Sequence, residues 1–197
     1  MIAVVDSGGA NISSIMFALE RVGITAVFTR DAVVISNAER VILPGVGTAE
    51  IAMSRLKELN LIECIRGLTQ PVLGICLGMQ ILFEYSSEGN VDLLGVFPGN
   101  LMRFDEGKSG VVPHMGWNNV RIISNHRLTD NIPQESYFYF VHSYYAHKTE
   151  NTVGVCYYGD EFSAIVAKDN FIGCQFHPER SGKIGEQLLD NFLKIKL

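Results

Sequence analysis

The sequence is poor in charge, and its charges are not gathered in blocks. Charged residues make up 19% of the 197 residues, against about 25% in an average globular domain. Sixteen Lys and Arg stand against 21 Asp and Glu, which gives a formal net charge of -5. Without a basic cluster the chain offers no electrostatic surface for nucleic acid or for an anionic membrane. We therefore expect neither as a partner.

Long apolar runs are missing too. The apolar stretch at residues 67–83 contains Gln70, Pro71 and Gln80, whereas a membrane span needs about 20 mostly apolar residues. No basic residue precedes Arg21, although a secretory signal begins with a basic region. We therefore expect a cytoplasmic protein in which this stretch lies in the interior.

Cysteine is scarce and shows no pairing pattern. The four cysteines lie at positions 64, 76, 156 and 174, with neither a Cys-x-x-Cys pair nor the spacing of a zinc finger. No group of His, Cys, Asp and Glu has metal-ligand spacing, and the glycine turn after Asp6 is not a dinucleotide-binding loop. The sequence therefore predicts no metal and no cofactor.

Apolar residues, in contrast, make up 47% of the chain, enough for one sizeable core in a single domain over residues 1–197. In the first half, short β-rich runs at residues 1–5, 40–43 and 71–75 lead through glycine-containing turns into helical spacing, and Asn11 is expected to cap the first helix. This alternation favours a mostly parallel α/β sheet with helices on both faces.

The second half reads as a β-rich extension of the same sheet. Short strands are predicted at residues 119–123, 137–142, 153–158, 163–167 and 171–176. A hairpin turn at Lys168-Asp169-Asn170 is predicted between the last two of them. An amphipathic helix with apolar Ile184, Leu188 and Phe192 closes the chain.

The sharpest local motif is Gly-Ile-Cys-Leu-Gly around Cys76. Its glycines permit a cramped strand-to-helix turn that exposes one side chain, as in a nucleophile elbow. Helix N–H groups and a neighbouring imidazolium would lower the pKa of such a thiol and make it a nucleophile. A free Cys is also often a small buried hydrophobe, so this motif alone leaves both interpretations open.

A second motif, Phe-His-Pro-Glu, supplies a possible base. His177 and Glu179 are two residues apart after an apolar run, which would place them on one face of an extended chain. The carboxylate could then orient the imidazole for Cys76, as in a catalytic triad. A turn with a solvated His and Glu is the alternative.

A third motif, Pro-Gly-Val-Gly around Val46, follows another strand. Its glycines allow backbone N–H groups to face a ligand, although a plain βα turn would look the same. The three motifs all follow strands, and sites in open α/β sheets gather beyond the carboxyl ends of strands.

With these motifs in place, the sequence resembles the class I (triad) glutamine amidotransferases, and among them the family of glutaminase subunits of imidazole glycerol phosphate synthase. The motifs that carry the resemblance follow the family's order from end to end: LPGVGT, PVLGICLGMQ, PHMGWN, YFVHSYY and QFHPERSG. The resemblance implies a flavodoxin-like open mixed sheet.

The resemblance also implies a role for individual residues. Cys76 would attack the amide of L-glutamine, His177 would transfer protons and Glu179 would orient His177, so that a thioester forms and water releases glutamate. The backbone N–H groups of Val46 and Leu77 would bind the oxyanion. Glutamine would be bound by Gly47, Gln80, Ser143 and Tyr144. A partner interface would include Trp117, Asn118, Tyr139 and Arg180.

The implied partner is a (β/α)8 cyclase subunit, in a heterodimer, that uses the ammonia to make imidazole glycerol phosphate and AICAR in histidine biosynthesis. A triad glutaminase serving another synthase, such as a cyclase-like paralogue, would keep the same glutaminase residues. A non-catalytic α/β module with an inert Cys76 and a γ-glutamyl peptide hydrolase are the further alternatives.

Overall fold

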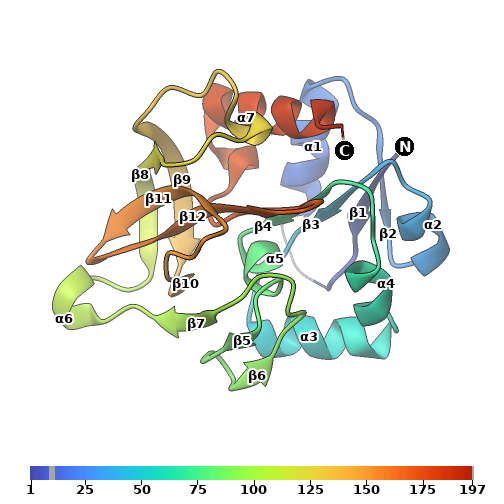
Figure 1. Ribbon diagram of the computed structural model, residues 1–197. Coiled ribbons are helices and arrows are strands. Elements are labelled where there is room, and N and C mark those ends of the chain that lie inside the picture. The colour runs from blue at the N-terminus through green and yellow to red at the C-terminus, as the bar shows by residue number, and fades with distance from the viewer. Residues whose placement is uncertain (9–11, 197) are drawn as a thin grey trace.

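A twisted nine-stranded sheet runs through the molecule, with helices on both faces (Figure 1). The structure is a computed structural model that describes residues 1–8 and 12–196. Within these residues the strand order of the sheet is β2 (Ala26–Thr29), β1 (Ile2–Val5), β3 (Arg40–Leu43), β4 (Val72–Ile75), β13 (Phe171–Cys174), β12 (Asp160–Lys168), β11 (Thr152–Tyr158), β8 (His114–Ile122) and β9 (Ser136–His142).

The sheet is parallel in one half and antiparallel in the other. Strands β2, β1, β3, β4 and β13 pair in parallel with one another, and β12, β11, β8 and β9 continue the sheet from β13 with antiparallel pairs. The prediction of a mixed sheet is confirmed. Strand β13 belongs to both halves, because it forms a hairpin with β12 and lies parallel to β4.

Alternating side chains of the parallel strands fill two cores. In β1, Ile2 and Val4 pack with α1 (Ile12–Arg21) and α7 (Gly182–Lys194), whereas Ala3 and Val5 face the helices on the other side. Those are α2 (Ala32–Ser36), α3 (Ala49–Glu58) and α4 (Ile62–Arg66). Figure 1 shows α1 and α7 above the sheet and α3 and α4 below it. The predicted cap Asn11 lies outside the described residues.

A small second sheet was not predicted. It comprises, in order, β10 (Tyr144–Ala146), β7 (Asn100–Arg103), β5 (Tyr85–Ser86) and β6 (Val91–Asp92), and α6 (Glu106–Ser109) follows β7. Strands of two to four residues are too short to show alternation. This sheet joins the segment after Cys76 to the segment after β9.

Two of the predicted elements differ clearly in their bounds from the observed ones. The helical spacing after Cys76 yields only a single turn, α5 (Leu77–Gln80), because residues 81–83 are buried on all sides and turn toward the second sheet. Strand β8 begins at His114 rather than near residue 119, because its first residues pair with β9 from His142 back to Phe138.

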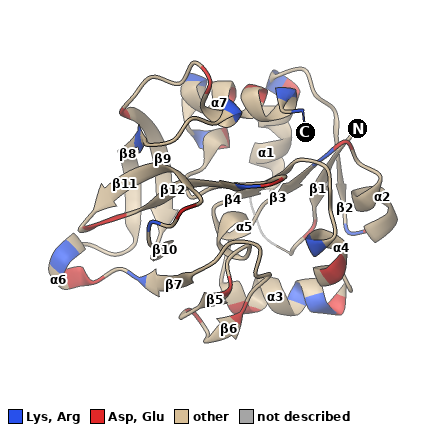
Figure 2. Cartoon of the chain, in the orientation of Figure 1, with Lys and Arg blue, Asp and Glu red and all other residues tan. Residues whose placement is uncertain are grey.

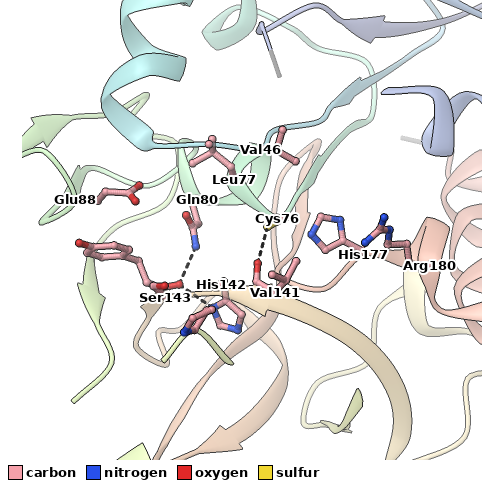
Figure 3. A pocket seen from close by; sticks show the side chains of 13 residues that line it. Val46, Cys76, Leu77, Gln80, Glu88, Val141, His142, Ser143, His177 and Arg180 are labelled. Carbon is pink, nitrogen blue, oxygen red and sulfur yellow. Dashed lines mark hydrogen bonds between the residues drawn. The ribbon is translucent and has the colours of Figure 1, made fainter. Parts of the chain in front are cut away.

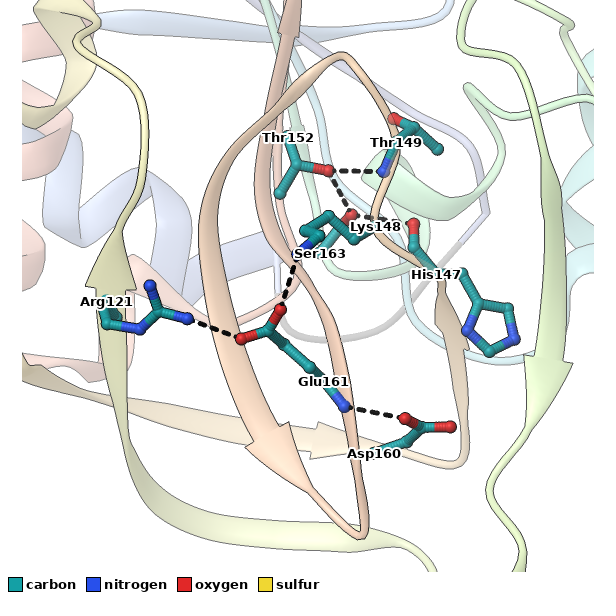
Figure 4. A network of polar contacts seen from close by, with 8 residues as sticks. All are labelled: Arg121, His147, Lys148, Thr149, Thr152, Asp160, Glu161 and Ser163. Carbon is teal, nitrogen blue, oxygen red and sulfur yellow. Dashed lines mark hydrogen bonds and ion pairs between the residues drawn. The ribbon is translucent and has the colours of Figure 1, made fainter.

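The antiparallel half is joined by one buried and one exposed group of polar contacts (Figure 4). Thr152 and Ser163, both buried, share a hydrogen bond of 2.7 Å between β11 and β12. On the surface, the carboxylate of Glu161 accepts hydrogen bonds from Arg121 and Lys148. Figure 2 shows the Lys, Arg, Asp and Glu residues mixed along the ribbon rather than collected in one region.

Candidate active site

Cys76 occupies a strained turn at the end of β4. Its backbone has φ 53° and ψ -112°, a combination that residues other than glycine rarely adopt. The flanking glycines make the turn possible: a Cβ at Gly74 would lie 2.6 Å from the Gly78 carbonyl oxygen, and a Cβ at Gly78 would collide with the Leu43 carbonyl. The predicted elbow is thus present, and its strain is typical of a functional position.

His177 and Glu179 form a buried pair next to this turn. Nδ1 of His177 lies 2.8 Å from Oε1 of Glu179, and both residues are less than 10% exposed. The pair does not form through strand alternation, because β13 ends at Cys174 and the chain enters a 3-10 helix, Pro178–Arg180. This turn brings the carboxylate back to the imidazole. The Ser181 hydroxyl donates to the His177 carbonyl at 2.7 Å.

The surroundings of His177 favour its charged form. Burial alone would lower its pKa, but the hydrogen bonds and charges of Cys76 and Glu179 outweigh burial and raise the pKa of His177 to about 10. Figure 3 shows the His177 ring beside the Cys76 sulfur. A protonated imidazole next to a thiol can stabilise a thiolate and later deliver a proton to a leaving group.

The thiol opens into a cavity of about 480 Å³. Cys76, His177 and all six residues predicted for the oxyanion and for glutamine line it, namely Val46, Gly47, Leu77, Gln80, Ser143 and Tyr144. Glu179 lies behind His177 and is not part of the lining. The structure therefore brings the three sequence motifs to one place.

The Pro-Gly-Val-Gly segment packs directly against the elbow. A Cβ at Gly45 would lie 2.8 Å from the Gly78 nitrogen, so only glycine permits this contact. Gly47 has φ 100°, the left-handed region in which a side chain would be strained. Val46 thus faces the cavity between two positions that require glycine.

Gln80 is fixed by its own hydrogen bonds. Its amide nitrogen donates to the Tyr144 carbonyl at 2.8 Å and to Oε1 of Gln175 at 3.0 Å, so its carbonyl oxygen is the group left for a ligand. The Ser143 carbonyl accepts from the backbone N–H of Phe104.

Three residues of the site were not assigned from the sequence. Glu88 contributes the one carboxylate among the described lining residues. His142 lines the cavity and is buried, and Gln175 donates to Sγ of Cys76 at 3.8 Å. Gln175 lies two residues before His177, but nothing in the local pattern shows that it faces the cysteine. The signal for Glu88, a lone carboxylate in a loop, is equally weak.

The residues predicted for a partner interface divide between two faces of β8. Trp117 pairs with Tyr139 across β8 and β9, their rings 6.1 Å apart, and the Arg180 guanidinium lies 5.8 Å from the Tyr139 ring. Met115, Trp117, Tyr137 and Tyr139 form what we call the aromatic face, and the first three are more than half exposed. Asn118 projects to the opposite face of β8.

The described residues hold neither a cluster of metal ligands nor a helix that could span a membrane. Across residues 1–8 and 12–196, no three His, Cys, Asp or Glu side chains come together as metal ligands. In the same part of the chain, none of the helices has the length and apolar character needed to cross a membrane.

Comparison with known proteins shows the family. The family Glutamine amidotransferase class-I matches residues 3–195, and the chain therefore belongs to the class I glutamine amidotransferases. It is similar to the Haemophilus influenzae protein named imidazole glycerol phosphate synthase subunit HisH, with 51% identity over 98% of this chain and 96% of that protein. A protein of the same name from Colwellia psychrerythraea is 46% identical over 98% of this chain and 92% of its own length.

Solved structures agree on the fold. A crystal structure described as a glutamine amidotransferase superposes with a TM-score of 0.75 at 18% identity, covering 98% of this chain and 97% of the other. A glutamine amidotransferase from Thermotoga maritima superposes with a TM-score of 0.66, also at 18% identity, over 98% of this chain and 81% of the other. At this identity the likeness concerns the fold alone.

Proposed function

We propose that this chain is the glutaminase subunit of an imidazole glycerol phosphate synthase, which hydrolyses L-glutamine to glutamate and ammonia. The observation that carries the proposal is a cysteine in a strained turn, open to a cavity and beside a buried His–Glu pair. The identity of about half of all residues to the Haemophilus influenzae subunit supports the choice of synthase.

The proposed reaction proceeds in two halves. The Cys76 thiolate attacks the side-chain amide carbon of glutamine, and His177 delivers its proton to the departing nitrogen, so that ammonia leaves and a γ-glutamyl thioester remains. His177 then takes a proton from water as the water attacks the thioester, and glutamate leaves while the thiolate is restored. Glu179 orients His177 and stabilises its charged form throughout.

The backbone N–H groups of Leu77 and Val46 are proposed to bind the oxyanion. Leu77 opens α5 directly after the nucleophile, and Val46 lies across the cavity on the Pro-Gly-Val-Gly segment. One donor of this kind typically contributes about 10²–10³ in rate. A shift of the segment around Val46 would therefore switch the rate of the first half-reaction.

The cavity provides groups for both ends of glutamine. The carboxylate of Glu88 suits the α-ammonium group, because it brings a negative charge to the lining. The free carbonyl oxygen of Gln80 and the backbone around Gly47, Ser143 and Tyr144 are proposed to orient the remainder of the substrate.

The proposed partner is a (β/α)8 cyclase subunit that consumes the ammonia in the cytoplasm. The aromatic face and Arg180 are the proposed docking surface, because aromatic and Arg side chains dominate interface energies. Arg180 also lines the cavity, so the docking surface and the glutamine site are continuous. We propose that Asn118 also contributes to the partner interface, although it lies on the face of β8 opposite the aromatic face.

The test is glutamate release from glutamine by the purified chain, with and without the histidine-pathway cyclase and its phosphoribosyl ligand. We expect low activity alone, strong stimulation by the loaded cyclase, and loss of both in Cys76→Ala. Cys64→Ala, at a half-buried thiol outside the cavity, is the matched control and should behave like wild type.

Labelling by a glutamine-analogue electrophile separates the alternatives. Labelling of Cys76 without stimulation would keep the glutaminase and assign it to another synthase. Neither labelling nor glutamate release would contradict the proposal and favour an inert module.

A further inference from the structure

Two buried histidines lie behind the cavity, outside the Cys76–His177–Glu179 group. His114 on β8 and His142 on β9 are directly paired across the two strands. Nδ1 of His114 lies 2.9 Å from Nε2 of His142, and the residues are only 3% and 6% exposed. His142 lines the cavity, whereas His114 does not.

The Tyr144 carbonyl fixes which atom donates and which accepts in each hydrogen bond of this pair. Nδ1 of His142 lies 2.8 Å from the Tyr144 carbonyl oxygen, which can only accept, so this nitrogen carries the proton. Nε2 of a neutral His142 must then accept, and Nδ1 of His114 must donate to it. The remaining nitrogen of His114 accepts from Asn118 Nδ2 at 3.2 Å.

This chain of hydrogen bonds begins on β8 and ends at the glutamine cavity. Asn118 is tied to the Tyr157 carbonyl at 3.0 Å. At the other end, the Tyr144 carbonyl accepts from both His142 and Gln80 and so uses both of its lone pairs. The position of Gln80 in the cavity therefore depends on a carbonyl that the two histidines hold.

Aromatic rings surround His114 and keep the pair neutral. The His114 ring is stacked on Tyr158 at 4.1 Å and on Phe140 at 4.8 Å between centroids. Burial lowers the pKa of His114 to about 4. For His142, burial together with the nearby charges of His114 and His177 outweighs the hydrogen bond to the Tyr144 carbonyl and lowers the pKa to about 3. Near neutral pH both rings carry one proton each, as the chain of hydrogen bonds requires.

We propose that His114 is a positioning residue for glutamine binding, which acts through His142 to fix the Tyr144 carbonyl and, with it, the Gln80 side chain. The inference rests on the proposed glutaminase function. It gives the Pro-His-Met-Gly-Trp-Asn motif a second role besides the exposed Trp117. Side chains alternate along β8, so Trp117 belongs to the aromatic face while His114 and Asn118 lie on the opposite face.

Two substitutions of His114 separate hydrogen bonding from space filling. His114→Phe keeps a ring between Tyr158 and Phe140 but removes the donor to His142. His114→Asn removes the ring but places an amide N–H where Nδ1 was, because both nitrogens are bonded to Cγ. If His114 only filled space, the Phe variant would be the milder one.

The experiment measures kcat and KM for glutamine in the complex with the loaded cyclase. We expect His114→Phe to raise KM about tenfold, since leaving a buried acceptor unpaired costs about 1–3 kcal/mol, with kcat within about twofold of wild type because Cys76 and His177 are untouched. His114→Asn should keep KM within about twofold. Thermal unfolding of each variant checks that it is folded.

The outcomes distinguish this inference from the proposed function. A wild-type complex that releases no glutamate would overturn the proposed function and the inference with it. An active wild type in which His114→Phe leaves KM unchanged, or in which His114→Asn raises KM as much as His114→Phe, would overturn only the role of His114.

Discussion

Two regions of this molecule bury histidine, and they treat it in opposite ways. His177 lies between a thiol and the carboxylate of Glu179, which raise its pKa to about 10. His114 and His142, packed among aromatic rings on the neighbouring strands, have pKa values lowered to about 4 and about 3. Burial acts against the charge in all three cases. The neighbours decide the outcome, and with it the role.

The difference suits two kinds of task. A charged imidazole can stabilise a thiolate and give up a proton, so the region of His177 fits chemistry. A neutral imidazole offers one donor and one acceptor in a fixed order, so the pair His114–His142 fits the transmission of position. The two regions meet at the cavity, where His177 and His142 both belong to the lining.

Among the changes that test this difference between the histidines, removing the carboxylate beside His177 should have the largest effect. In Glu179→Gln the amide cannot stabilise the imidazolium, so the pKa of His177 falls and glutamate release should drop by about 10² or more. Glu186→Gln, a change of the same type at the surface pair of Glu186 with Arg21, is the control. Activity of Glu179→Gln within about twofold of wild type would show that the carboxylate is not needed.

A smaller effect is expected from the carboxylate on the opposite side of the cavity. Glu88→Gln removes the charge proposed for the α-ammonium group of glutamine but keeps an oxygen for the Ala49 N–H. KM for glutamine should rise about tenfold to a hundredfold, because hydrogen bonds to charged groups are worth about 1.5–3 kcal/mol, with little change in kcat. Glu84→Gln, at a carboxylate that binds the Gly99 N–H outside the cavity, should leave KM unchanged.

The pH dependence of stability should carry opposite signs in the two regions. The lowered pKa values of His114 and His142 contribute stability above pH 6.5 that is lost as pH falls toward 4 and 3, because the unfolded chain takes up the protons first. The raised pKa of His177 contributes stability below pH 6.5 that is lost as pH rises through about 10.

Chemical denaturation at two pH values measures how much unfolding free energy is lost on acidification. Between about pH 7.5 and pH 5, each buried neutral histidine should cost about 2 kcal/mol of unfolding free energy. His114→Asn should therefore lose about 2 kcal/mol less than wild type over this range. An equal loss in both proteins would mean that His114 titrates normally in the folded state.

The smallest effect is expected at the exposed ion pairs of Arg121 and Lys148 with Glu161 (Figure 4). Arg121 lies on β8, the strand that carries His114. Arg121→Gln should change the unfolding free energy by less than about 1 kcal/mol, and by less still in high salt. KM should not move. A change in KM would show that the glutamine site responds to any disturbance of β8 and that His114 has no special role in positioning Gln80.

The elements that define the fold could be predicted from the sequence. The buried runs of β1, β3 and β4 are short, apolar and followed by glycine turns, so both the strands and the edge where the site forms were visible. The nucleophile position of Cys76 could be predicted because its flanking glycines permit a tight strand-to-helix turn. Local sequence is informative at these positions because backbone geometry there permits few residues.

Other features depend on contacts between distant segments. His114 and His142 are 28 residues apart and meet only through the register of β8 and β9. Glu88 lines the cavity and Gln175 contacts the Cys76 sulfur from loops whose course no periodicity describes. The sequence does not predict the 3-10 helix that brings Glu179 back to His177, because an extended chain would also place these two side chains on one face. Such positions follow from packing, which the order of residue types does not encode locally.

The most direct test of the account is the charge state of the five histidines, read from long-range ¹H–¹⁵N correlation spectra and assigned by single substitutions. Near about pH 7 we expect His177 to give the signal of an imidazolium, protonated on both nitrogens, and His114 and His142 to give signals of neutral rings protonated on Nδ1. Acidification to about pH 5 should leave the latter two unchanged. A neutral His177, or titration of His114 and His142 near the ordinary histidine pKa, would contradict the account.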